Sequence, residues 1–191
     1  EDAIIAVNGG FYNMDKGGSA TYLEENDTVF HQHIPLDQKW AIADWAKTGA
    51  IIIDTTGQLK LEAAKSLAFY TNSTAETSVL ITGPLLIENG KKIDLINTDF
   101  VNKRHPRTCL CETSDDFLLL TIDGRKPFAK GMSLLELQIF LIEQQCTQAI
   151  NLDGGGSTTM WLKDKGIVNT PSDIFWERKV ANALVVKLKI D

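Results

Sequence analysis

The order of hydrophobic and polar positions predicts many short strands and few helices. Apolar runs bounded by Gly, Pro, Asn or Asp are typical of strands. Asn89-Gly90 predicts a tight hairpin turn, because both residues adopt positive φ at low cost. Ser114-Asp115 predicts a second hairpin turn. The expected strands lie at 3–7, 21–23, 50–54, within 79–95, and at 107–113, 116–123, 148–152, 158–163 and 180–190.

One helix is strongly indicated, and it begins at Ser133. Ser133 and Glu136 have the spacing of a capping box. Apolar side chains then recur at helical intervals, which predicts a buried stripe and a helix that ends near Gln145. A helical turn is also expected near 36–45. Because most neighbouring strands are linked as hairpins, the pattern predicts an α+β fold: a single domain over 1–191, with a mixed or largely antiparallel sheet and a few packed helices.

Composition and charge narrow the class of partner. The chain has 191 residues and a net charge of −6, and an acidic surface repels phosphate backbones, so no nucleic-acid partner is expected. The longest apolar stretch, residues 132–142, is too short to span a bilayer, so no transmembrane segment is expected in this chain. The sequence begins directly on the strand at 3–7, and we expect residues upstream of the domain to be missing.

The cysteines and histidines give no clear metal site. Cys109 and Cys111 alternate on one face of a strand, where packing is the favoured interpretation; pairing of Cys146 with one of them is the alternative. His31 and His33 would share one face of a strand, yet no third ligand is indicated. We interpret them, and His105, as surface or loop histidines. No metal and no cofactor is assigned.

Three consecutive glycines follow the strand at 148–152. Successive glycine amides that turn toward one point would form a concave anion site, and Ser157, Thr158 and Thr159 add hydroxyl donors. Asp153, at the end of the strand, is placed to orient water, accept a proton or hold a cation. The alternative is a tight bend that needs glycine for lack of space. The segment has the spacing of neither a P-loop nor a dinucleotide-binding loop.

Charged residues lie at the ends of other predicted strands. Arg107 begins one strand and suits bidentate binding of a phosphate. Asp123 and Arg125 follow the next strand, and Glu177-Arg178 precedes the last. A single charged residue in a turn is usually a solvated surface group. The convergence of several such residues on strand ends is what indicates a site.

Seven segments, in order, resemble the phosphodiester glycosidase family, and they cover nearly the whole chain. Cys109 and Cys111 depart from the small or apolar residues more usual in the family. The segments are 6–11 (AVNGGF), 82–86 (TGPLL) with 89–91 (NGK), 106–108 (PRT), 122–125 (IDGR), 133–137 (SLLEL), 151–159 (NLDGGGSTT) and 177–184 (ERKVANAL).

The resemblance implies hydrolysis of a sugar-1-phosphodiester at the anomeric C–O bond, which releases a sugar and a phosphomonoester. It also implies a phosphorylated sugar or glycan as substrate and an exported protein. The alternative function is a non-catalytic domain that binds cell-envelope glycans on the same scaffold. The expected catalytic residues are Asp153, then Asp123 or Glu177, and Arg107. The expected substrate-binding residues are Asn8, Gly9, Gly10, Gly83, Arg125, Gly154, Gly155, Gly156, Ser157, Thr158, Arg178 and Asn182.

The chemistry of these residue types agrees with that reaction. A departing phosphate needs stabilisation of its charge more than a strong acid, and arginines with glycine amides supply it. Attack of water on an oxocarbenium-like centre benefits from a carboxylate, for which Asp153 is the first choice. Asn8 and the amides of Gly9 and Gly10 are expected to hold sugar hydroxyls or the phosphate.

Overall fold

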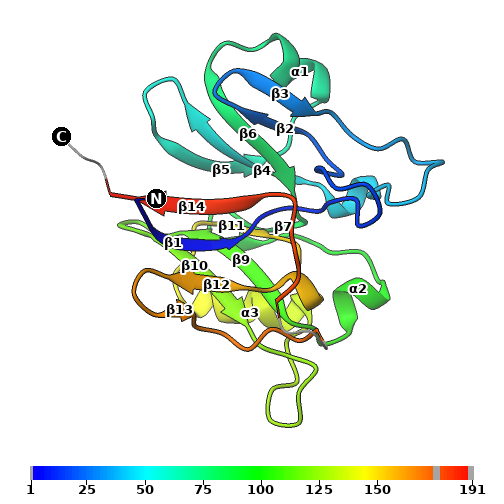
Figure 1. Ribbon diagram of the computed structural model, residues 1–191, viewed down its shortest axis with the longest axis vertical. Coiled ribbons are helices and arrows are strands. Elements are labelled where there is room, and N and C mark those ends of the chain that lie inside the picture. Colours follow the sequence, from blue (N-terminus) through cyan, green and yellow to red (C-terminus); the bar gives the residue numbers. More distant parts are fainter. Residues whose placement is uncertain (1, 174–176, 189–191) are drawn as a thin grey trace.

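The computed structural model describes residues 2–173 and 177–188, whose strands form three sheets (Figure 1). All strand pairs within these residues are antiparallel. The first sheet has the order β13 (Gly166–Ile167), β12 (Met160–Leu162), β1 (Ala3–Asn8), β14 (Ala183–Lys187). The second is β10 (Phe117–Ile122), β9 (Arg107–Glu112), β11 (Gln148–Asn151), β7 (Leu85–Glu88), β8 (Lys91–Lys92). The third is β3 (Thr28–His31), β2 (Leu23–Glu25), β6 (Glu76–Thr82), β4 (Gly49–Asp54), β5 (Leu59–Ala63).

Helices are few and short, which confirms the predicted α+β class. They are α1 (Leu67–Asn72), α2 (Asp99–Asn102) and α3 (Leu134–Glu143), with 3₁₀ turns η1 (Asp44–Ala46) and η2 (Gly155–Ser157). The capping box of Ser133 and Glu136 begins α3 as predicted. Residues 36–45 contain turns and the start of η1 only. None of the described helices is long and apolar enough to cross a membrane.

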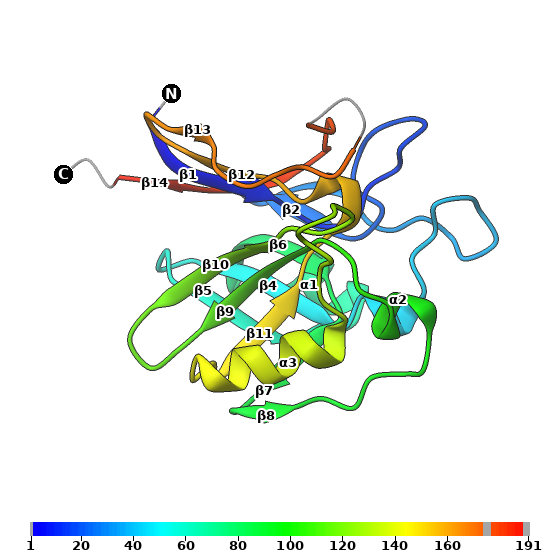
Figure 2. The same cartoon turned by 90° about the horizontal axis from the view of Figure 1, so that it is seen from below.

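The chain forms layers around a shared core. Figure 2 shows α3 across one face of the second sheet and the first sheet across the other. Leu134, Leu137 and Leu141 of α3 are fully buried against the second sheet. On its other face, Ile150 and Leu110 pack with residues of the first and third sheets. The ends of β1, β9 and β11 therefore meet near the centre of the molecule.

The chain passes from the third sheet to the second at the cis peptide bond Gly83–Pro84. The structure confirms a hairpin at Asn89-Gly90, where φ is 50° and 71° and β7 pairs with β8. The neighbouring strands β6 and β7 lie in different sheets. Gly83 itself has φ of 150°, and a side chain there would meet the Ala46 carbonyl at 3.0 Å.

A disulfide joins Cys111 of β9 to Cys146, which follows α3, while Cys109 is free and buried. The favoured interpretation of Cys111 as a packing residue is therefore wrong, and the alternative holds. We expect Cys111→Ser to lower the free energy of unfolding by about 2–4 kcal/mol, because the bond closes a loop with a sequence separation of 35. Chemical denaturation checks this, with Cys109→Ser as the control that removes a thiol but no crosslink. Equal midpoints for Cys111→Ser and the wild type would contradict it.

An apolar cavity of 1040 Å³ lies between the three sheets, among aliphatic side chains such as Ile51, Leu119 and Val186. Of the predicted site residues, Asn182 lines this cavity and Asp153 does not. The large cavity and the charged groups described next are therefore separate features of the molecule.

Candidate functional site

Asp153 follows β11 at the point where the first and second sheets meet. Its backbone amide donates to the Gly9 carbonyl at 3.0 Å, and its carbonyl accepts from Asn8 Nδ2 at 2.6 Å. These bonds fix the direction of its side chain, whose Oδ1 accepts from the Gly154 amide at 2.9 Å. Burial raises the pKa of the Asp153 carboxyl, and the nearby groups Ser157 and Arg178 oppose that rise. A carboxylate with raised proton affinity is suited to accept a proton from water.

Asn8 connects four segments around Asp153. Besides the Asp153 carbonyl, its side chain accepts from Thr108 Oγ1 at 2.6 Å and from the Thr159 amide at 3.2 Å. It is 3% exposed. These partners occupy both ends of the amide group. In this arrangement the Asn8 side chain holds β1, β9 and the glycine loop in register. Its predicted contact with substrate stays a prediction.

Gly9 and Gly10 are held by Asn182. The Gly9 amide donates to the Asn182 carbonyl at 3.0 Å, and the Gly10 amide donates to Asn182 Oδ1 at 2.7 Å. Both amide hydrogens are donated within the protein. The amides of Gly9 and Gly10 are therefore not free donors, although the sequence predicts that they bind a ligand. Asn182 Nδ2 is buried without a hydrogen-bond partner among the described residues. That group keeps a donor available beside Gly10.

The glycine loop does not form the predicted anion cradle. Gly154 donates to Asp153, and the Gly155 amide donates to the Pro106 carbonyl at 2.9 Å. The amides of Ser157 and Thr158 donate back to the carbonyls of Gly154 and Gly155, so η2 uses most of its own donors. A site for phosphate must therefore rely on side chains.

Lack of space explains the three glycines. A Cβ on Gly154 would lie 2.8 Å from the Pro106 carbonyl oxygen, and one on Gly155 would lie 3.0 Å from the Arg125 guanidinium. A Cβ on Gly156 would overlap the ion pair of Asp173 and Arg178. The alternative reading of the loop, as a crowded bend, is the one the structure supports. The crowding consists mainly of charged side chains.

Arg125 lies on the glycine loop from the β10 side. Its Nη2 is 3.3 Å from Nδ1 of His105, and the guanidinium packs on Gly155. Arg125 is largely exposed, with φ of 56°. Partial burial, Arg107, Arg125 and Lys103 lower the pKa of His105, while Asp99 opposes the decrease. A neutral imidazole accepts from Arg125 through Nδ1, which orients the guanidinium toward the loop.

Arg178 reaches the glycine loop from the segment before β14. It binds Asp173 through two bonds, Nε to Oδ2 at 2.7 Å and Nη2 to Oδ1 at 3.0 Å. Its Nη1 lies 3.5 Å from Ser157 Oγ. Burial lowers the pKa of Arg178, but Asp173 and, to a smaller extent, Tyr12 raise it above its ordinary value. Arg125 and Arg178 therefore flank the loop that begins at Asp153, each held in direction by one partner.

Arg107 is buried, and its hydrogen bonds go to backbone carbonyls, so its predicted catalytic role stays a prediction. It is 1% exposed and donates from Nε to the Met132 carbonyl and from Nη2 to the carbonyls of Phe100 and Lys103. Its guanidinium lies 5.0 Å from the centre of the Phe100 ring. Burial lowers the pKa of Arg107 to about 10, so the group stays charged at neutral pH. It is a structural cation that holds the segment behind His105.

The other predicted catalytic carboxylates are not placed beside Asp153. Asp123 accepts from the Thr170 amide at 2.9 Å and from Asn169 Nδ2 at 3.2 Å. Asn169 in turn binds the Thr158 carbonyl, so Asp123 supports the loop from one step away. Glu177 is exposed and follows residues 174–176, which lie outside the described part.

Gly83 and Thr158 are buried around the site rather than in it. The Gly83 carbonyl accepts from Asn151 Nδ2 at 2.8 Å, which ties the end of β6 to β11. Thr158 is 1% exposed, and its hydroxyl has no partner among the described residues. Neither arrangement tests binding of a substrate, so their predicted contacts stay predictions.

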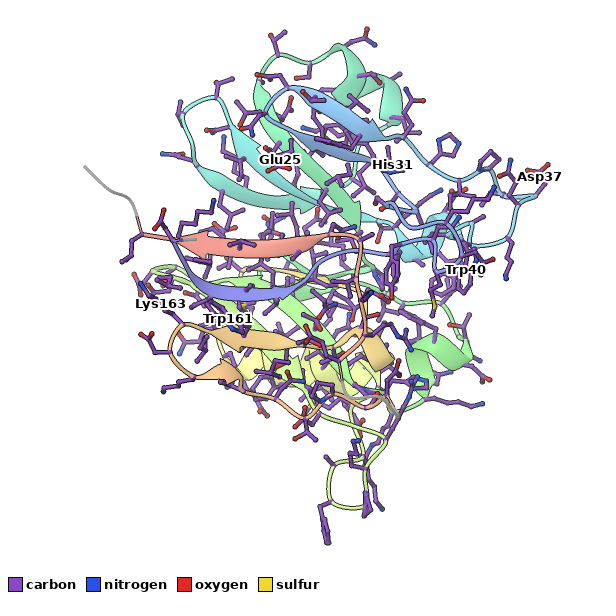
Figure 3. The ribbon with its side chains drawn as sticks, in the orientation of Figure 1. Glu25, His31, Asp37, Trp40, Trp161 and Lys163 are labelled. Atoms are coloured by element: carbon purple, nitrogen blue, oxygen red, sulfur yellow. A yellow bond between two sulfur atoms is a disulfide. The ribbon has the colours of Figure 1, made fainter. Side chains whose placement is uncertain are left out.

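Three residues of the site were missed by sequence reasoning. Asp173 and Tyr12 carried no motif, and His105 was interpreted as a loop histidine. The one available signal was position, since His105 directly precedes Pro106-Arg107 in a segment already singled out. His31 is the last residue of β3, in the third sheet, and Figure 3 shows it away from β12 and Trp161 of the first sheet. Among residues 2–173 and 177–188, no group of three or more His, Cys, Asp or Glu side chains is placed to hold a metal ion.

Comparison with known proteins shows the family of this chain. Residues 1–187 match the family described as phosphodiester glycosidase. The chain belongs to the phosphodiester glycosidase family. The fold is also that of the zebrafish N-acetylglucosamine-1-phosphodiester alpha-N-acetylglucosaminidase catalytic domain auto-inhibited by pro-peptide, with a TM-score of 0.75 and 21% identity over 98% of this chain and 64% of that one. This supports a hydrolase of the glycosidase kind.

Curated relatives of this glycosidase-family chain match over shorter stretches. The bovine N-acetylglucosamine-1-phosphodiester alpha-N-acetylglucosaminidase is 39% identical over 75 residues, or 39% of this chain and 14% of that protein. The prophage-derived uncharacterized protein YomE of Bacillus subtilis is 32% identical over 92 residues, or 48% of this chain and 14% of that protein. The aligned part is thus about one seventh of each relative.

Proposed function

We propose that this phosphodiester glycosidase-family domain hydrolyses a sugar-1-phosphodiester at the anomeric C–O bond. One observation carries the proposal: a half-buried carboxylate, Asp153, begins a crowded loop that is flanked by two oriented guanidinium groups, Arg125 and Arg178. The pairing of one base with two fixed cations suits a reaction in which water attacks carbon and a phosphate departs.

The arginines serve the departing phosphate. Among the described residues, His105 is the one side-chain hydrogen-bond partner of Arg125. The remaining N–H donors of Arg125 are therefore available to a phosphoryl oxygen. Asp173 holds Arg178 through two bonds, which fixes the direction of the remaining Nη1 donor beside Ser157. Donors that are already oriented stabilise developing charge without reorganisation.

Asp153 serves the attacking water. In the proposed step, a water oxygen bonds to the anomeric carbon and gives its proton to the Asp153 carboxylate. The bond between that carbon and the bridging oxygen breaks, and its electron pair stays on the oxygen, which leaves as part of a phosphomonoester. No acid is required, because the departing charge spreads over the phosphoryl oxygens that Arg125 and Arg178 bind.

Hydrolysis in H₂¹⁸O tests both the reaction and the bond that breaks. We expect the full chain to convert a synthetic N-acetylglucosamine-1-phosphodiester to free sugar and phosphomonoester, with ¹⁸O found in the sugar by mass spectrometry. Label in the phosphate would show P–O cleavage and reject the glycosidase proposal. Binding of the ester without hydrolysis would favour the glycan-binding alternative.

Acidification is expected to inactivate the domain partly through His105. Because the folded pKa of His105 is lowered, the ring stays neutral until the pH falls below its ordinary value; once protonated, it repels Arg125 and ceases to accept its hydrogen bond. The limiting slope of log kcat/KM on the acid side should therefore be about two in the wild type, from His105 and Asp153, and about one in His105→Gln. An unchanged slope in His105→Gln would contradict the role of His105.

The lowered pKa of His105 also affects stability. The stability contributed by neutral His105 is present above its unfolded pKa and decreases as pH falls below that value.

We also propose that the protein is exported and acts on a phosphorylated sugar or glycan outside the reducing cytoplasm. The disulfide between Cys111 and Cys146 supports an oxidising compartment. Alkylation of thiols in protein isolated without reductant tests this: one modified cysteine, Cys109, after unfolding supports export, and three modified cysteines oppose it.

A further inference from the structure

A short hairpin projects from the edge of the candidate site. Lys126 and Ala129 exchange both backbone hydrogen bonds, at 3.0 and 3.2 Å, so that Pro127 and Phe128 form the turn between them. Phe128 is fully exposed, at 103%. Figure 1 shows the segment between β10 and α3 as a loop that extends away from the body of the molecule. Among the large apolar side chains of the described residues, Phe128 is the most exposed, and the next, Leu36, is 63% exposed.

The charge of the hairpin is one-sided. Residues 124–131 (GRKPFAKG) contain Arg125, Lys126 and Lys130 and no acidic residue, within a chain whose net charge is −6. The nearby acidic groups have other partners: Glu136 pairs with Arg104, Asp99 pairs with Lys103, and Asp123, directly before the hairpin, accepts hydrogen bonds from Thr170 and Asn169. Lys126 and Lys130 flank the turn that carries Phe128, and neither forms a salt bridge among the described residues.

From these two observations we infer that the hairpin 125–131 docks on a surface of anionic lipid headgroups, with the Phe128 ring among the headgroups and Lys126 and Lys130 on their phosphates. An aromatic tip with flanking lysines matches an interface that is apolar inside and negatively charged outside. The closed turn keeps the ring exposed before binding, so little conformational freedom is lost on docking.

The position of the hairpin connects this surface to the chemistry. The hairpin begins at Arg125, whose guanidinium packs on Gly155 beside Asp153. A domain docked through Phe128 therefore holds its glycine loop close to the lipid surface, where a sugar phosphodiester linked to a lipid or envelope polymer is within reach. This step rests on the proposed function, whereas the docking itself does not.

Vesicle co-sedimentation of the full chain tests the docking. We expect binding to phosphatidylcholine vesicles that contain about 30 mol% phosphatidylglycerol, and much weaker binding to phosphatidylcholine alone or at high salt. Phe128→Ala should lower the partition coefficient by about ten- to a hundredfold, which is the value of burying one such ring. Lys126→Gln with Lys130→Gln should remove the preference for anionic vesicles. Phe30→Ala is the matched control, because Phe30 is 57% exposed on β3 of the third sheet.

Two outcomes would overturn the inference. Equal sedimentation of wild type and Phe128→Ala would show that the ring does not enter the interface. Absence of vesicle binding together with a raised KM of Phe128→Ala for a soluble sugar phosphodiester would assign the ring to the substrate instead. If soluble phosphodiester is not hydrolysed at all while Phe128-dependent vesicle binding persists, the proposed reaction fails and the docking surface stands.

Discussion

Asp153→Asn is expected to lower kcat for a sugar-1-phosphodiester by about 10³-fold or more, with a smaller change in KM. Asn retains the size of the side chain and its acceptor oxygen toward the Gly154 amide, but it cannot take a proton from water. The fold and the arginines remain in place, so binding of the ester should persist while turnover stops. Steady-state kinetics of release of the free sugar measures the change.

Asp123→Asn is the matched control for this substitution. Asp123 accepts hydrogen bonds from Thr170 and Asn169 and supports the loop from behind. We expect it to lower stability and to change kcat by less than about tenfold. Loss of turnover in Asp123→Asn with activity retained in Asp153→Asn would reverse the assignment and make Asp123 the catalytic carboxylate.

The pH dependence of the free energy of unfolding gives a second, independent test of Asp153→Asn. Burial raises the folded pKa of Asp153 above its unfolded value, so between these values the folded state binds more protons than the unfolded state. The free energy of unfolding therefore decreases as pH rises through that window. Above it, the ionised carboxylate destabilises the fold by a constant amount. Asn removes this cost, and the variant should be more stable than the wild type at neutral pH and less different from it in acid.

Strands with alternating or continuous apolar residues could be predicted because burial selects those residues. β9, β10 and β11 all lie within their predicted ranges. β3 was missed because all four of its residues are exposed, so no apolar alternation marks it. The helices α1 and α2 were missed because they are six and four residues long, too short for a helical period to appear.

The partners of strands were harder to predict than the strands themselves. Residues 79–95 contain two consecutive apolar runs. The chain nevertheless passes from the third sheet to the second at Gly83, so β6 and β7 pair with different strands. Predicted end residues 158–159 and 180–182 lie outside β12 and β14. The backbone groups of Thr158, Thr159 and Asn182 bond to the glycine loop, Asn8 and Gly9 instead of a strand partner. Residues 189–190 of the last predicted strand lie outside the described part.

Distant partners were even harder to predict for the residues of the candidate site. Asp153 was identifiable because a carboxylate beside three glycines at a strand end needs a local reason. The amide cradle was wrong because the loop donors are used by Pro106 and by the loop itself, and no local pattern reveals which distant carbonyl takes a donor. Arg107 shows a related limit: its side chain suits phosphate, but only the packed structure shows that it donates to the carbonyls of Met132, Phe100 and Lys103.

Gly156→Ala is expected to lower kcat/KM by about a hundredfold while the protein stays folded. The added methyl group would overlap Asp173 Oδ1 and Arg178 Nη2. Both atoms are ends of flexible side chains, so they move aside at a cost of about 1 kcal/mol in stability. The movement breaks the two-bond pair and turns Arg178 away from Ser157 and the departing phosphate, and loss of one oriented donor lowers turnover by about 10²-fold.

Gly166→Ala separates this effect from a general cost of replacing glycine. Gly166 is the first residue of β13, with φ of 72° and open space around its Cα, so alanine there strains the backbone by about 1 kcal/mol without contact with the site. The two variants should therefore melt at similar temperatures, while only Gly156→Ala loses kcat/KM. If Gly156→Ala retains wild-type kinetics, the Asp173–Arg178 pair does not orient the donor, and phosphate stabilisation falls to Arg125 alone.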